Sequence, residues 1–123
     1  MRYLTDRKRA VGKGASHTGT EHHWYMQISA VALAFLLPVW VYIFGHALGQ
    51  GHAAVVATFA RPFPAILTGL VLFVSMRHFA KGAQMMIEDY SHGYTRKALV
   101  IAAISLSYVV IATGLFALAR IAL

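Results

Sequence analysis

The sequence predicts an all-α membrane protein with three transmembrane helices, a cytoplasmic N-terminus and a periplasmic C-terminus. Of its 123 residues, 59% are hydrophobic and only 12% are charged, and the mean hydropathy is +0.61. The apolar residues form three blocks, each long enough to cross a hydrocarbon core of roughly 30 Å. Cations gather at the ends of these blocks that the positive-inside rule assigns to the cytoplasm.

Two parts of the chain differ in composition. Residues 1–23 form a predicted cytoplasmic segment, and residues 24–123 form a predicted three-helix membrane anchor, with helices at about residues 24–48, 63–87 and 98–122. Three helices enclose little volume and leave almost no chain for a soluble domain. We therefore expect this chain to be one subunit of a larger membrane assembly.

The N-terminal segment is basic and does not resemble a cleavable signal peptide, because the first apolar block is too long for a signal sequence. Without a soluble basic domain, the net charge of +7 indicates membrane topology and binding to anionic lipid headgroups, and no nucleic-acid partner. Its cations are Arg2, Arg7, Lys8, Arg9 and Lys13. We expect its histidines, His17, His22 and His23, in a wet part of the segment.

The first predicted helix contains Pro38, which should kink it, and ends before Gly49 and Gly51. The following loop carries no cation before Arg61, so it is expected on the periplasmic side. The second helix is expected to start within Arg61-Pro62-Phe63-Pro64, since proline is tolerated in a first helical turn.

Ser91-His92-Gly93 breaks the chain after Tyr90, and Arg96 and Lys97 are expected in the loop between the second and third helices. This loop is predicted on the cytoplasmic side, whereas the end of the third helix has only Arg120. Asp89 and Tyr90 would then lie at the cytoplasmic membrane surface. His78 would lie about 12 residues deeper, or roughly 18 Å along the helix.

His78 is a titratable residue inside an apolar stretch, which makes it a candidate for a functional site. Gly82, Met85 and Asp89 follow on the same helical face. A flat, bulky group bound through His78 could approach the backbone at Gly82, and an axial histidine is the usual haem ligand. In the alternative reading, His78 hydrogen-bonds to a neighbouring helix and Gly82 serves helix packing.

The chain has no cysteine, which excludes iron–sulfur clusters and thiolate metal sites within it. A neighbouring face of the same helix is charged. Its cations could offset haem propionates or pair with a partner subunit, or they could snorkel to the membrane interface. This face contains Arg77, Lys81, Gln84 and Glu88.

The second helix resembles the D-subunit membrane anchor of bacterial succinate dehydrogenase (succinate:quinone oxidoreductase). The pattern is a histidine, a glycine four residues later, and Asp-Tyr eleven and twelve residues after the histidine, as in His78, Gly82, Asp89 and Tyr90. Further similarity lies in the N-terminal half, at Gly14-Ala15-Ser16, at Gly19-Thr20-Glu21-His22-His23-Trp24 and at Ala30-Val31-Ala32-Leu33.

The resemblance implies a function and a set of site residues. His78 would be one axial ligand of haem b, with the second ligand in the C-subunit. Tyr90 would donate a hydrogen bond to a ubiquinone carbonyl, and Asp89 would support that tyrosine. FAD and the iron–sulfur clusters would belong to the flavoprotein and iron–sulfur subunits, where succinate is oxidised. The location would be the bacterial inner membrane, or the mitochondrial inner membrane in a eukaryote.

One position departs from the family pattern. Family members often have an arginine near the start of the first helix, beside the haem propionates, and this chain has Gln27 there. Lys81 lies one turn from His78 toward the predicted cytoplasmic side. We hypothesise that Lys81 takes part in the haem site by neutralising a propionate.

Three other functions remain open from the sequence. A fumarate reductase anchor would use the same site in the reverse direction. A haem-free accessory subunit of another respiratory complex would show no effect of changes at His78 or Tyr90. A small transporter or channel subunit is disfavoured, since the ionisable residues concentrate on the second helix.

Overall fold

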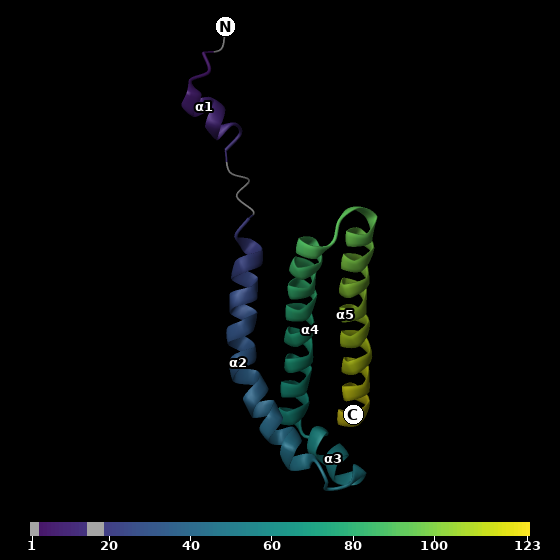
Figure 1. The fold of residues 1–123 in the computed structure, drawn as a ribbon. Coiled ribbons are helices and arrows are strands. Elements are labelled where there is room, and N and C mark those ends of the chain that lie inside the picture. The colour runs from purple at the N-terminus through teal and green to yellow at the C-terminus, as the bar shows by residue number, and fades with distance from the viewer. Residues whose placement is uncertain (1–2, 15–18) are drawn as a thin grey trace.

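The computed structural model describes residues 3–14 and 19–123, and all regular structure in these ranges is helical. Arg2, Ala15, Ser16 and His17, which entered the sequence analysis, lie outside the described residues. The helices are α1 (Asp6–Val11), α2 (Glu21–Ala47), α3 (His52–Phe59), α4 (Pro62–Tyr90) and α5 (Gly93–Ala122) (Figure 1).

Three of these helices, α2, α4 and α5, are long and apolar enough to cross a membrane. They have 27, 29 and 30 residues. The prediction of an all-helical chain with three membrane-crossing helices is therefore confirmed. Which end of the helices faces the cytoplasm stays a prediction.

The connection between α4 and α5 is shorter than the sequence suggested. Helix α4 continues to Tyr90, and α5 already begins at Gly93, whose φ of 61° favours glycine. Only Ser91 and His92 lie between the two helices. Arg96 and Lys97, expected in a loop, therefore lie in the first turns of α5.

Two short helices lie where the sequence predicted no regular structure. In α1, the Oγ1 atom of Thr5 accepts a hydrogen bond from the backbone N–H of Lys8 at 3.2 Å, which caps the helix. Helix α3 occupies most of the connection between α2 and α4. Gly49 and Gly51, with φ of 81° and 86°, turn the chain into it.

The three long helices stand in a row with α4 in the middle (Figure 1). Helix α4 packs against both α2 and α5, whereas α2 and α5 do not pack on each other within the described residues. The start of α2 and the α4–α5 turn lie at one end of the row, and α3 and the C-terminus lie at the other. Helix α2 bends in its lower half and contains Pro38, as predicted.

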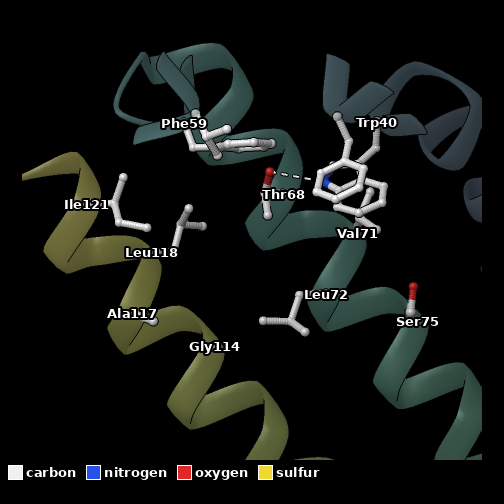
Figure 2. Close-up of a pocket in the computed structure, with 12 residues that line it drawn as sticks. Trp40, Phe59, Thr68, Val71, Leu72, Ser75, Gly114, Ala117, Leu118 and Ile121 are labelled. Carbon is white, nitrogen blue, oxygen red and sulfur yellow. Dashed lines mark hydrogen bonds between the residues drawn. The ribbon is translucent and has the colours of Figure 1, made fainter. Parts of the chain in front are cut away.

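An apolar cavity of about 480 Å³ lies at the α3 end of the row, between α2, α3, α4 and α5. At its edge the indole Nε1–H of Trp40 donates to the Thr68 hydroxyl at 3.1 Å, which ties α2 to α4 (Figure 2). Leu72 projects from α4 toward the part of α5 that contains Gly114. The close approach of these two helices therefore depends on the missing side chain at Gly114.

We expect Gly114→Ala to destabilise the packing of α4 on α5, and Gly69→Ala to leave it unchanged. A Cβ atom at Gly114 would overlap the Cδ2 atom of Leu72, whereas one at Gly69 would lie 3.5 Å from Leu115, an ordinary contact. Leu72 can turn toward the cavity, so the cost should be about 1 kcal/mol, the lower end for overpacking. Thermal unfolding of the detergent-solubilised protein with its partners measures the difference. Equal melting temperatures for the two variants would contradict this packing.

Candidate functional site

His78 lies half-buried on α4, opposite Ser29 of α2. The hydroxyl oxygen of Ser29 is 2.7 Å from Nδ1 of the His78 ring. Ser29 is itself only 4% exposed. A partly buried polar pair therefore joins two membrane-crossing helices, and it is the hydrogen bond to a neighbouring helix that one reading of His78 expected.

The seam between α2 and α4 is defined by three contacts that follow one antiparallel register. Beside the Ser29–His78 pair, a Cβ atom at Gly82 would lie 3.6 Å from the terminal methyl of Met26. The third contact is the Trp40–Thr68 hydrogen bond at the other end of the seam. Gly82 thus faces α2 of its own chain, where the Met26 side chain borders the space beside it.

His22 lies on the same face of α2 as Ser29, although the sequence suggested a wet position. It lies in the first turn of α2, seven residues before Ser29 and therefore on the same helical face. Its Nε2 atom is buried and has no hydrogen-bond partner among the described residues. The helix starts before the apolar block does, and this brings His22 into the structured region.

The second ring nitrogen of His78 is open. Nε2 forms no hydrogen bond with a described residue, and it is not closed off from the surface of the chain. Within residues 3–14 and 19–123, no group of three or more metal-ligating side chains gathers around it or elsewhere. One available histidine nitrogen suits the axial position of a haem whose second axial ligand comes from another chain. It does not suit a metal ion held by this chain alone, which needs three or four protein ligands.

Lys81 lies half-buried on α4, three residues after His78. Among the described residues the one ion pair joins Arg9 to Asp6, so Lys81 has no acidic partner there. Glu88, the acid that could have paired with it, accepts a hydrogen bond from the Gln84 side chain at 2.8 Å. The Lys81 ammonium therefore remains available to an anion from outside the described chain.

Arg77 has a different role from Lys81. Its Nη1 atom donates to the phenol oxygen of Tyr108 on α5 at 2.6 Å. Its guanidinium carbon also lies 5.8 Å from the ring centroids of both Tyr25 on α2 and Tyr108, within cation–π range. Arg77 thus connects the two outer helices across α4, and aromatic rings stabilise its charge.

Asp89 and Tyr90 form the last two residues of α4, beside the two-residue turn to α5. Both are exposed, and Tyr90 is 84% exposed. The structure does not bring them next to His78, since they lie about three helical turns further along the same helix. A bound molecule at Tyr90 would need a second chain to cover it.

Gln27 lies on the outer side of α2. It is two residues from Ser29 and thus roughly 200° around the helix, so it points away from α4. There it lines a shallow apolar hollow with Trp24, Ile28, Ala30 and Val31. A side chain at this position faces a partner subunit or lipid, and not the seam that holds His78.

Ser29, Tyr25 and Tyr108 were not identified from the sequence. A serine in a membrane helix commonly bonds a carbonyl of its own helix, so Ser29 alone gave no distinctive signal. One clue was available, because Ser29 shares a helical face with His22 and Met26. A role for Tyr25 and Tyr108 was even less evident from the sequence, since both lie within apolar blocks.

The chain is similar to known proteins over its whole length. A sequence model of the family described as "Succinate dehydrogenase/Fumarate reductase transmembrane subunit" matches residues 1–116. The chain is also 47% identical, over 123 residues, to a "Succinate dehydrogenase hydrophobic membrane anchor subunit" of Paracoccus denitrificans. That alignment covers 100% of this chain and 95% of the relative. No solved structure matches the chain.

The family resemblance inferred from the second helix is thereby confirmed, together with a role as a multi-pass membrane anchor that assembles with other subunits. The three apolar helices agree with this role. The chain belongs to the family of succinate dehydrogenase and fumarate reductase transmembrane subunits.

Proposed function

We propose that this chain anchors a succinate dehydrogenase in the bacterial inner membrane, ligates haem b through His78 and forms part of the ubiquinone-reduction site. The observation that supports this most directly is the state of the His78 ring. Ser29 occupies one ring nitrogen, and the other has no hydrogen-bond partner among the described residues and is not buried. A histidine serving only to hold two helices together would not need an open second nitrogen.

In this proposal His78 supplies one axial ligand and the C-subunit supplies the other. Bound haem would provide a one-electron carrier within the membrane. The chain's own contribution is to fix the ring between α2 and α4, where Gly82 lets α4 pack beside Met26 of α2. Arg77 stabilises the arrangement by connecting α2 and α5.

The quinone would bind at the Tyr90 end of α4. The Tyr90 hydroxyl would donate a hydrogen bond to a quinone carbonyl, and Asp89 would support it. Because Tyr90 is so exposed in the isolated chain, neighbouring subunits must complete the pocket. Succinate oxidation, FAD and the iron–sulfur clusters belong to those partners, since this chain has no cysteine to hold a cluster.

An absorption spectrum of the complex purified through this chain tests the proposal. A reduced-minus-oxidised b-type spectrum, with succinate-dependent reduction of ubiquinone, is the expected result. A complex without haem b would support the structural-subunit alternative instead. Comparing succinate oxidation with fumarate reduction on the same preparation identifies the favoured direction.

Lys81→Met should lower the reduction potential of the haem. Lys81 would neutralise a propionate, and a nearby positive charge favours the reduced, less positive iron. A charge-assisted hydrogen bond is worth about 1.5–3 kcal/mol, and a differential effect of about 1.4 kcal/mol corresponds to about 59 mV in a one-electron potential. Redox titration of the complex measures the shift.

Lys97→Met is the matched control for Lys81→Met. It removes the same charge from an exposed position in the first turns of α5. Its potential should equal that of the unmodified protein. Equal potentials for the Lys81 and Lys97 variants would exclude Lys81 as a propionate partner.

A further inference from the structure

We infer that Ser29 is a positioning residue for His78: it holds the ring in the tautomer that carries its proton on Nδ1, so that the Nε2 lone pair faces outward as the haem ligand. The inference rests on the proposed haem ligation and adds the group that prepares the ligand. It follows from the hydrogen-bond geometry around one hydroxyl group.

The Ser29 hydroxyl has one proton to donate and two lone pairs that accept. Its oxygen lies 2.8 Å from the carbonyl oxygen of Tyr25 and 3.1 Å from that of Met26. A carbonyl oxygen can only accept, so the hydroxyl proton is directed to the backbone of its own helix. Donation to His78 instead would leave two close oxygen–oxygen contacts without a proton between them.

The oxygen of Ser29 therefore accepts at its contact with His78, and Nδ1 must be the donor at 2.7 Å. A neutral imidazole carries one ring proton, so Nε2 is left with a lone pair. This is the form that binds a metal, and the bond made by one ring nitrogen decides which form the other takes.

The surroundings of Ser29 keep this pair in place. Ser29 is buried within the long helix α2. The seam is closed on one side by Met26 against Gly82 and on the other by the Trp40–Thr68 bond. Since α2 cannot slide along α4 without breaking these contacts, the serine oxygen stays opposite Nδ1.

The accepted hydrogen bond also affects the iron. A bond from Nδ1–H to an acceptor raises the basicity of the opposite ring nitrogen, and this favours ferric over ferrous haem. Removing the acceptor should raise the midpoint potential, the opposite direction from Lys81→Met. Changes to such supporting partners typically weaken metal binding by about 10- to 100-fold.

The test is a redox titration and a ferric-haem EPR spectrum of the purified complex carrying Ser29→Ala. We expect a raised midpoint potential, an altered low-spin EPR signal and haem loss in detergent that is about tenfold greater. Ser29→Thr keeps the hydroxyl and should restore all three properties. Ser29→Cys substitutes a weak sulfur acceptor in similar volume, so it should lie between the two and serves if the alanine variant does not assemble.

Ser107→Ala is the matched control. Ser107 is 2% exposed on α5, and among the described residues its hydroxyl bonds only the Ala103 carbonyl of its own helix, at 2.8 Å. If Ser29→Ala and Ser107→Ala gave the same potential and EPR signal, the positioning role would be wrong. Haem ligation itself would still be judged separately, by whether His78→Leu loses the b-type spectrum.

Discussion

His78→Leu is expected to abolish the b-type absorption spectrum of the purified complex and to loosen its association with the partner subunit. Leucine has no ring nitrogen to ligate iron, and it removes the hydrogen bond that joins α4 to Ser29 of α2. Loss of one hydrogen bond costs about 0.5–1.5 kcal/mol, so the α2–α4 seam weakens as well. Haem content per complex and copurification of the partner subunits measure the two effects.

His52→Leu controls for the loss of a histidine as such. His52 is exposed at the start of α3, at the end of the row away from Tyr90, and should be neutral for the spectrum. If His78→Leu kept an unchanged spectrum and unchanged axial ligation, the haem assignment would fail.

Tyr90→Phe is expected to lower ubiquinone reduction by about 2- to 10-fold, the equivalent of one hydrogen bond worth about 0.5–1.5 kcal/mol. The phenylalanine keeps the ring and removes only the hydroxyl donor. Succinate oxidation by a soluble artificial acceptor should persist, because it does not use the quinone site. Steady-state assays with the two acceptors, on the same membranes, measure both rates.

Tyr94→Phe provides the comparison, since Tyr94 is an exposed tyrosine just across the α4–α5 turn. It should leave both rates unchanged. Equal loss of both activities in Tyr90→Phe would indicate failed assembly, and unchanged quinone reduction would remove Tyr90 from the site.

The three membrane helices could be predicted because each is a long block of apolar residues, which the sequence shows directly. Their ends could not be predicted as well. Polar residues such as Glu21, Asp89 and Arg96 lie in helical turns beyond the apolar blocks, since a helix can continue into the headgroup region where water satisfies polar groups. The short helix α3 was missed for the opposite reason: its apolar residues looked like part of a loop between longer blocks.

The pattern on α4 identified His78, Gly82, Asp89 and Tyr90 as candidates, but not what lies opposite them. Pairing Ser29 with His78 requires the register between two helices, which depends on the path of the chain through α3. The Arg77 contacts are less predictable still, because they join three helices through two tyrosines. Helical periodicity describes one helix at a time and contains no information on such pairings.

The row arrangement of α2, α4 and α5 bears on how cells make this protein. Because α2 and α5 do not close around α4, a newly inserted copy without its subunits would present to lipid the second nitrogen of His78 and the charge of Lys81, neither of which has a partner among the described residues. Polar groups in hydrocarbon are costly, and such a chain is a natural substrate for membrane proteases. The amount of this subunit in the cell is then expected to follow the supply of the partner subunits that cover these groups.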